Sequence, residues 1–284
     1  MTDATPGIQQ NLDPARWREH RFGLTPARWA ALAGRCFWIA GAGTGFGRSM
    51  AVALAAAGAR VVLSGRRNEM LLESIGEMRG LGIPTADAIP LVLDITDARA
   101  VAAAVTEIEH RCVGLNGLVC SAALPQAGDG PFPLMSMSPE RWESLLRTNV
   151  TGSWLVTRAA LPLMLKRASA RVVYLTSEAG WAFTPGFGAY NVTKSALNNL
   201  GASFAAECEA QYPEADVQIN VLVPGEARTE MNRGSADSPY AIACMTLALL
   251  SHPPGGPNGY FFHRDGRHLS FAYRGPHQRP LLDR

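Results

Sequence analysis

A tyrosine and a lysine lie four residues apart in Tyr190-Asn191-Val192-Thr193-Lys194, and Lys194 is one of only two lysines in the chain. Residues i and i+4 share one face of a helix. A phenol ordinarily ionises near pH 10, and a fixed positive charge beside it favours the phenolate and lowers its pKa. The pair therefore predicts a general acid/base that exchanges a proton with an alcohol or carbonyl oxygen. A solvated helix face carrying an ordinary Tyr and Lys would show the same spacing.

A glycine-rich turn near the N-terminus follows the short apolar run Cys36-Phe37-Trp38-Ile39-Ala40 and precedes an alanine-rich helical stretch from Arg48 to Ala57. Its glycines at 41, 45 and 47 form the pattern G-x-x-x-G-x-G. Between a strand and a helix, such a turn lets backbone amides approach a pyrophosphate at the positive end of the helix. The turn predicts a dinucleotide site, although any tight turn can be rich in glycine.

These motifs, with others in the same order, resemble the short-chain dehydrogenase/reductase family, in its single-domain branch with G-x-x-x-G-x-G and Y-x-x-x-K. The match runs in register from about Arg35 to Gly266, and Ser177 precedes Tyr190 by the family's 13 residues. The resemblance implies four catalytic residues: Asn149, Ser177, Tyr190 and Lys194. It implies that Asn149 holds a water in the proton path and that Lys194 contacts the nicotinamide ribose. The expected cofactor contacts are Gly41, Thr44, Gly45, Phe46, Gly47, Ser64, Arg66, Arg67, Asp94, Ile95, Ser121, Tyr190, Lys194, Pro224, Gly225 and Thr229.

One segment departs from the family pattern. Where the family usually shows Asn-Asn-Ala-Gly, this chain has Cys120-Ser121-Ala122-Ala123. Alanine costs more than glycine wherever the backbone must be left-handed, so the loop geometry at Ala123 is open to question. Cys120 lies near the expected cofactor pocket and is the cysteine whose reactivity is worth testing.

The cofactor choice is read after the second strand. Relatives that prefer NAD place an acidic residue at the position of Gly65, whereas here Arg66 and Arg67 follow a glycine. A guanidinium group suits the 2′-phosphate of NADP, and a carboxylate would repel it. We therefore predict NADP (NADPH) in preference to NAD. In the alternative, one or both arginines are solvated.

Strands and helices alternate along the chain, which predicts an α/β fold with a doubly wound parallel sheet, a Rossmann fold of seven strands with helices on both faces. Strands are expected near 36–41, 60–65, 89–94, 116–121, 171–177, 217–223 and 259–263, and long helices near 139–165 and 189–211. We divide the chain into an N-terminal extension (1–34), a Rossmann-fold catalytic domain (35–266) and a C-terminal tail (267–284). The extension is expected to be a surface arm that packs on its own subunit or a neighbour.

The C-terminal tail has two competing interpretations. It forms an edge hairpin and an oligomer contact, or one of Arg264, Arg267 and Arg274 reaches an active site and holds a phosphorylated or nucleotide-linked substrate. The substrate wall is expected from Gln126, Glu178, Trp181, Phe183, Phe187 and residues 226–231. The short stretch between Met231 and a helix starting near Tyr240 suggests an open pocket.

Three functions are compatible with these residues. The first is an NADP(H)-dependent oxidoreductase that transfers hydride between nicotinamide and a small-molecule carbonyl or secondary alcohol, with Tyr190 as general acid/base. A nucleotide-sugar-modifying enzyme with a tightly held cofactor is disfavoured, because position 44 is threonine rather than the glycine of G-x-x-G-x-x-G. A non-catalytic NADP-binding regulator is disfavoured because Tyr190 and Lys194 are both present.

Composition and charge exclude several other classes of protein. The net charge of +2 gives no case for nucleic acid, and the five cysteines form no C-x-x-C pair. No apolar run reaches the roughly 18 residues of a membrane span, and the N-terminus does not resemble a signal peptide. We expect no metal, no membrane association, a cytoplasmic location and, as is usual for the family, a homodimer or homotetramer.

Overall fold

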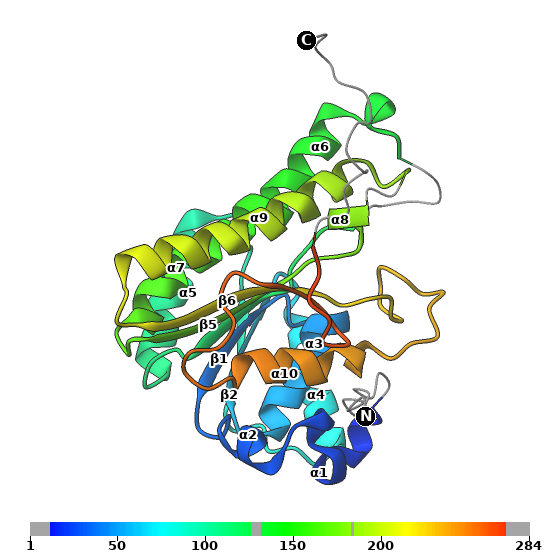
Figure 1. Ribbon diagram of the computed structural model, residues 1–284. Coiled ribbons are helices and arrows are strands. Elements are labelled where there is room, and N and C mark those ends of the chain that lie inside the picture. The colour runs from blue at the N-terminus through cyan, green and yellow to red at the C-terminus, as the bar shows by residue number, and fades with distance from the viewer. Residues whose placement is uncertain (1–11, 126–131, 183–184, 271–284) are drawn as a thin grey trace, which may run out of the picture.

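The computed structural model describes residues 12–125, 132–182 and 185–270. In these ranges a single sheet holds seven parallel strands in the order β3-β2-β1-β4-β5-β6-β7 (Figure 1). Their bounds are β1 Cys36–Ala40, β2 Arg60–Gly65, β3 Ala88–Val92, β4 Gly117–Cys120, β5 Ser169–Leu175, β6 Asp216–Val223 and β7 Phe261–His263. The strand order reverses direction at β1, which is the doubly wound topology. The predicted Rossmann fold is confirmed.

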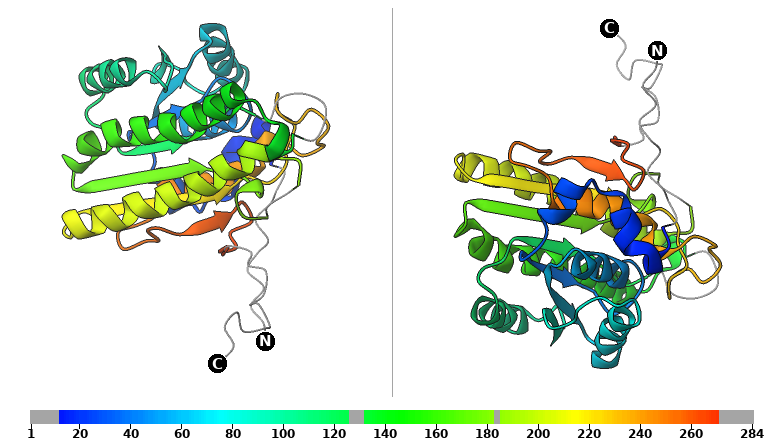
Figure 2. Two further views of the ribbon diagram at one scale, coloured as in Figure 1. Left: turned by 90° about the horizontal axis from the view of Figure 1, so that it is seen from above. Right: turned by 90° about the horizontal axis from the view of Figure 1, so that it is seen from below.

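Helices cover both faces of this sheet (Figure 2). One face carries α3 (Gly45–Ala56), α4 (Asn68–Gly80) and α10 (Ala243–Leu250), and the other carries α5 (Ala98–Arg111), α6 (Pro139–Leu146), α7 (Ser153–Leu165) and α9 (Gly188–Gln211). The shorter elements are α1 Trp17–His20, α2 Pro26–Ala30, α8 Ala179–Ala182, the 3-10 turns η1 Pro14–Arg16, η2 Arg21–Gly23, η3 Leu134–Ser136 and η5 Pro239–Ile242, and η4 Arg147–Gly152.

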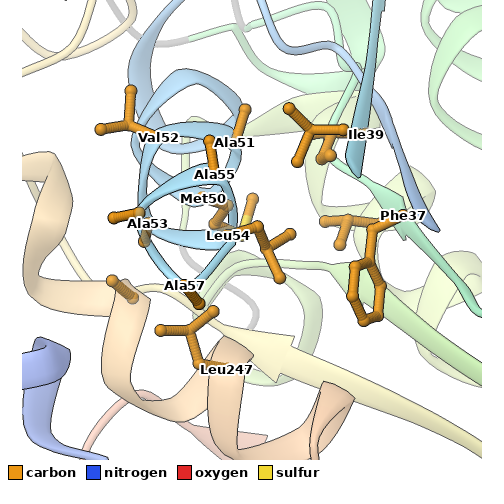
Figure 3. Close-up of a cluster of buried hydrophobic side chains, with 14 of the residues drawn as sticks. Phe37, Ile39, Met50, Ala51, Val52, Ala53, Leu54, Ala55, Ala57 and Leu247 are labelled. Atoms are coloured by element: carbon orange, nitrogen blue, oxygen red, sulfur yellow. The ribbon is translucent and has the colours of Figure 1, made fainter. Parts of the chain in front are cut away.

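Strand β1 divides the core into two layers because successive side chains point to opposite faces. Phe37 and Ile39 pack against Met50 and Leu54 of α3 and against Leu247 of α10 (Figure 3). The alternate residues of the strand belong to the cluster under α5, α7 and α9. A strand buried on both faces has no polar alternation, which is why this run is apolar throughout.

The long helix expected near 139–165 is interrupted. Between α6 and α7, the chain forms a π-helical turn, η4, over Arg147–Gly152. A π turn inserts one residue into the helical repeat and often marks a functional position. Asn149 lies in the middle of this turn and is 1% exposed, so the irregularity occurs where a predicted catalytic side chain must be aimed.

The N-terminal extension packs on its own chain and contributes to the core. Trp17 and Phe22 are buried in the same cluster as helix α3. The Phe22 ring stacks on Tyr240 of η5 with centroids 5.7 Å apart, and the Trp17 indole donates to the carbonyl of Leu81 at 3.0 Å. In Figure 1, α1 and α2 lie beside α10 and α4, below the sheet. The expected surface arm is therefore a layer over the α3–α10 side of the sheet.

After β7 the chain turns back on itself. The amide of His263 donates to the carbonyl of Arg267 at 2.9 Å, and the amide of Leu269 donates to the carbonyl of Phe261 at 2.7 Å. These bonds describe a short antiparallel return at the sheet edge. Its arginines are engaged by carboxylates, Arg264 by Asp237 at 2.6 Å and Arg267 by Asp265 at 2.7 Å. The third tail arginine considered above, Arg274, lies outside the described residues.

Candidate active site

A cavity of about 1330 Å³ lies at the carboxyl ends of the central strands. It brings together most of the predicted site residues, from the turn after β1 to the start of α9. Those in its lining are Gly41, Thr44, Gly45, Phe46, Arg66, Arg67, Asp94, Ile95, Ser121, Ser177, Tyr190, Lys194, Pro224, Gly225 and Thr229. Three others, Gly47, Ser64 and Asn149, lie behind this wall. Ser64 accepts a hydrogen bond from the indole of Trp38 at 2.8 Å and is fully buried.

The glycine turn is shaped by close backbone contacts. A Cβ at Gly47 would lie 1.9 Å from the carbonyl oxygen of Gly41, and a Cβ at Gly41 would lie 2.5 Å from the amide nitrogen of Ala122. Gly41 also has φ of +94°, a region that side chains rarely adopt. Residues larger than glycine would therefore push the turn away from α3 and the β4 loop, and would remove the open backbone that a pyrophosphate needs.

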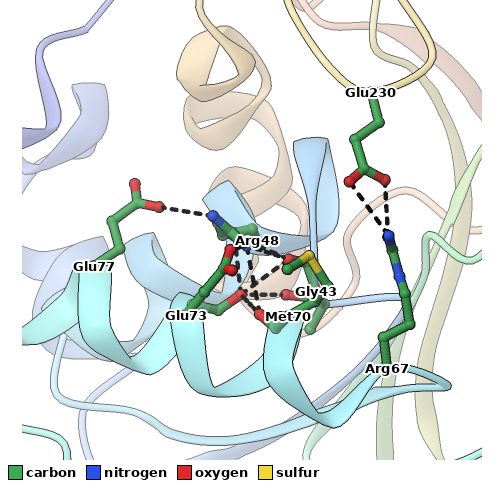
Figure 4. Close-up of polar contacts among 9 residues, drawn as sticks. Gly43, Arg48, Arg67, Met70, Glu73, Glu77 and Glu230 are labelled. Carbon is green, nitrogen blue, oxygen red and sulfur yellow. Dashed lines mark hydrogen bonds and ion pairs between the residues drawn. The ribbon is translucent and has the colours of Figure 1, made fainter.

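Arg48, on α3, binds the backbone of the same glycine turn and was not identified from the sequence. Its Nε and Nη2 donate to the carbonyl of Gly43 at 2.9 and 2.6 Å, and Nη2 also contacts Glu73 at 3.0 Å (Figure 4). Ser74 donates to the carbonyl of Ala42 at 2.8 Å. With these carbonyls bound from the α4 side, the turn is fixed before any ligand arrives. No motif distinguishes such an arginine, because its side-chain partners Ser74 and Glu73 lie 26 and 25 residues away along the chain.

Asn149 ties the loop after β4 to helix α9. Its Oδ1 accepts from the amide of Leu124 at 2.7 Å, and its Nδ2 donates to the carbonyl of Leu124 and to Oγ1 of Thr193, each at 3.1 Å. The Thr193 hydroxyl donates in turn to the carbonyl of Tyr190 at 2.9 Å. Asn149 thus positions the first two turns of α9, where Tyr190 and Lys194 lie.

Ser177, Tyr190 and Lys194 meet where β5 ends and α9 begins. Ser177 Oγ accepts a hydrogen bond from the amide of Ala179 at 3.2 Å, and its interaction with the Tyr190 hydroxyl lowers the pKa of Tyr190. The Lys194 ammonium lies 5.5 Å from the centroid of the Tyr190 ring and donates to the carbonyl of Leu175 at 3.0 Å. The i, i+4 spacing has therefore placed both side chains on the cavity-facing side of α9, as the sequence predicted.

The ionisation of this group differs from the sequence expectation. Burial raises the pKa of Tyr190 to about 12, an effect that the Ser177 hydrogen bond opposes and the charge of Glu178 reinforces. Burial also lowers the pKa of Lys194 to about 8. The prediction that the pKa of Tyr190 moves toward neutrality is wrong for this structure, because the removal of the phenolate from water has the largest effect on that pKa.

The two arginines after β2 are in different situations. Arg67 forms an ion pair with Glu230 at 2.8 Å (Figure 4). Arg66 is exposed in the cavity wall, and in the described part of the chain its side chain has no hydrogen bond or ion pair. Burial disfavours the charge of nearby Asp94, but hydrogen bonds from Thr96 and the charges of Arg66 and Arg147 bring its pKa below the ordinary value.

The loop that departs from the family pattern is not strained at Ala123. Among the described residues, only Arg21, Phe22 and Ala168 have positive φ without being glycine. The left-handed backbone that would have made an alanine costly is therefore absent at position 123. Cys120 is buried with its Sγ 3.6 Å from the Thr157 hydroxyl, and burial raises its pKa to about 12. It is not a cavity residue, and its thiol is poorly suited to reaction.

The wall opposite the glycine turn combines apolar and acidic groups. Phe132, Phe187 and Met231 line it together with Glu178 and Glu226. Of the other expected wall residues, Trp181 is not part of the lining, and Gln126 and Phe183 lie outside the described residues. Nε2 of His263 lies 3.6 Å from the Glu178 carboxylate. In the described ranges no cluster of His, Cys, Asp or Glu could hold a metal ion, and no helix is long and apolar enough to cross a bilayer.

The doubly wound sheet, the glycine turn at its first strand and the serine, tyrosine and lysine at one cavity wall define a dinucleotide-binding protein of the Rossmann class. The chain belongs to the short-chain dehydrogenase/reductase family of oxidoreductases, since the family's sequence model, described as short chain dehydrogenase, matches residues 35–239. It is 30% identical to rat dehydrogenase/reductase SDR family member 4, over 76% of this chain and 74% of that protein.

Solved structures share the architecture. A putative short chain dehydrogenase from Pseudomonas syringae superposes with a TM-score of 0.75 at 28% identity, over 83% of this chain and 96% of that one. A putative short chain dehydrogenase from Shigella flexneri, solved in complex with NADP, gives a TM-score of 0.73 at 24% identity, over 83% of this chain and 99% of that one. At 24% identity, the similarity to the Shigella structure shows a shared fold and nothing further.

Proposed function

We propose that this protein is an NADP(H)-dependent oxidoreductase that transfers hydride between the nicotinamide and a small-molecule carbonyl or secondary alcohol. The observation that carries the proposal is the meeting of Ser177, Tyr190 and Lys194 in one wall of a cavity whose other end is the glycine turn. The turn fits a pyrophosphate, because a Cβ at Gly41 or Gly47 would fill the close backbone contacts that form the cradle.

Each side chain has a separate task in this proposal. The Ser177 and Tyr190 hydroxyls hold the substrate oxygen, and Tyr190 donates its proton to that oxygen during reduction. A phenol pKa of about 12 keeps this proton in place at neutral pH. Lys194 lies near the ring and orients it, and Asn149 fixes the start of α9, the helix that carries both residues. The bound nicotinamide would supply or accept the hydride.

Replacement of Tyr190 by phenylalanine tests the catalytic assignment. We expect the rate of NADPH oxidation with a panel of aldehydes and ketones to fall by about 10²–10⁴-fold, the usual contribution of a general acid. Affinity for NADPH, measured by calorimetric titration, should change little. Tyr212→Phe, at the exposed C-terminal end of α9, is the matched control. A Tyr190→Phe protein with near wild-type rates would contradict the assignment.

The preference for NADP rests on Arg66, on the absence of a carboxylate at Gly65 and on a fold that holds NADP in the Shigella relative. Arg66→Ala should weaken binding of NADPH about 10-fold or more while changing NADH binding much less, since a charge-assisted contact to the 2′-phosphate is lost. Equal losses for both nucleotides would show that Arg66 does not contact the phosphate.

The substrate end supports a neutral or hydroxylated compound better than a phosphorylated or nucleotide-linked one. Glu178 and Glu226 line it, and both would repel an anionic group. The described tail arginines, Arg264 and Arg267, are paired with carboxylates. Turnover of neutral carbonyls in preference to their phosphorylated counterparts is the expected result of a substrate screen.

A further inference from the structure

An ion pair crosses the cofactor end of the cavity. Arg67 follows β2, and Glu230 lies in the segment between β6 and η5, 163 residues further along the chain. Nη2 of Arg67 donates to one carboxylate oxygen of Glu230 at 2.8 Å, and Nη1 approaches the other at 3.4 Å. Both residues line the cavity, and Figure 4 shows them facing each other from the two sides. The pair therefore spans the groove beside the end of β2.

Because of this ion pair, the two neighbouring arginines differ in how freely they can bind an anion. Arg67 presents its terminal nitrogens to a carboxylate, whereas Arg66 is open to the cavity. The Arg67 hydrogen bond lowers the pKa of Glu230 below its ordinary value, so the carboxylate is ionised at neutral pH. The side chains of Arg67 and Glu230 are 52% and 49% exposed, and exposed ion pairs are weak enough to be displaced by a stronger anion.

We propose that Glu230 is a specificity-determining residue, which competes with the 2′-phosphate of NADP(H) for Arg67 and thereby limits discrimination against NAD(H). The inference rests on the proposed NADP site. Strand β2 ends at Gly65, which carries no side chain, and the facing segment brings the Glu230 carboxylate to the same end of the groove. A phosphate arriving there must displace Glu230 from Arg67 or bind through Arg66 alone.

The competition predicts how much NADPH affinity depends on Arg67. While Glu230 is present, the charge of Arg67 is already neutralised, so removing Arg67 should weaken NADPH binding little. Once Glu230 is replaced, the Arg67 guanidinium is free to bind the phosphate, and removing Arg67 should then weaken NADPH binding much more. The signature is therefore non-additivity between the two positions, since two independent contacts would give equal losses in both backgrounds.

The test is a double-mutant cycle of Glu230→Gln, Arg67→Ala and the double variant, with calorimetric titration of each protein by NADPH and by NADH. Glu230→Gln should bind NADPH about 3- to 10-fold more tightly with NADH changed less than about 2-fold, because only the phosphate is repelled by the carboxylate. Arg67→Ala should weaken NADPH binding less than about 3-fold alone and about 10-fold or more in the Glu230→Gln background. Glu107→Gln, which removes the same charge from an exposed pair with Arg111 on α5, should change neither affinity.

Other outcomes overturn the proposal. Equal losses from Arg67→Ala in the two backgrounds, with NADPH still preferred by the unmodified protein, would refute the competition and leave the proposed function intact. Weaker binding of both nucleotides by Glu230→Gln would mean that the ion pair closes the groove. If the unmodified protein binds neither NADPH nor NADH, the proposed function fails, and this inference fails with it.

Discussion

Replacing Lys194 by methionine should change how the protein's stability depends on pH, in the absence of cofactor. Lys194 is 4% exposed, and among the described residues its ammonium donates a hydrogen bond to the carbonyl of Leu175, which offsets part of its removal from water. Burial accordingly lowers its pKa from 10.5 to about 8. The folded protein therefore releases this proton more readily than the unfolded chain does, and the charge that orients Tyr190 in the proposed mechanism opposes folding.

The sign and size follow from proton linkage. Between about pH 8 and pH 10.5 the unfolded chain holds the lysine proton and the folded chain has lost it. Stability conferred by a group with this behaviour rises with pH across the window and is at its lowest below pH 8. At 1.36 kcal/mol per pH unit, the full difference is about 3 kcal/mol. Lys194→Met removes this titration. As the pH falls from 10.5 to 7, the free energy of unfolding of the variant should therefore rise by about 3 kcal/mol relative to that of the unmodified protein.

Urea unfolding, followed by tryptophan fluorescence between pH 7 and pH 10.5 under reducing conditions, measures the free energy of unfolding for both proteins. The lost hydrogen bond to Leu175 shifts the comparison equally at every pH. Tyr190 has a pKa of about 12 when folded and ordinarily ionises near pH 10, so its unfolded form titrates within the window, but it does so in both proteins and cancels from the comparison. Lys166→Met, at the other lysine, which is 62% exposed, should show no such pH dependence. A difference between Lys194→Met and the unmodified protein that stays constant with pH would refute this account of the buried charge.

Two further changes test the turn and the extension. Gly47→Ala places a methyl group 1.9 Å from a backbone oxygen, so it should lower the melting temperature and weaken NADPH binding about 10-fold or more. The control is Gly76→Ala on α4, where an added methyl group would meet nothing within 4 Å. This control should stabilise the protein by about 0.5–1 kcal/mol and leave NADPH affinity unchanged. Equal effects of both in thermal melts and titrations would contradict the steric argument. Phe22→Ala removes a fully buried ring and should reduce the free energy of unfolding in urea by about 3–5 kcal/mol; a loss below about 1 kcal/mol would mean that the extension does not belong to the core.

Much of the site was accessible from the sequence because its residues are set by local periodicity. The i, i+4 spacing of Tyr190 and Lys194 defines a shared helix face, and the glycine spacing defines a turn, whatever the surroundings. The direction of the Tyr190 pKa was not accessible in the same way. It depends on how much water the folded chain excludes, a property of the whole cavity, and burial reversed the effect that spacing alone suggested.

Long-range pairing was the other missing information. Glu230 meets Arg67 across 163 positions, and no local pattern links an acidic residue in a loop to a basic one after a strand. The packing of the extension has a signal in the sequence, since Trp17, Phe22 and Trp29 supply three large aromatic rings to one short stretch. The structure clusters these rings and buries Phe22 completely.

That aromatic layer has a practical consequence for how the protein is handled. The residues matched by the family, 35–239, end one residue short of Tyr240 and begin after Phe22, so both partners of the stacked pair fall outside them. A chain trimmed to that match would expose the apolar side of α3 and lose α10 entirely. We expect such a fragment to aggregate. Transferring the family-matched region into another member of the family would require residues 12–33 and 240–250 to be transferred with it.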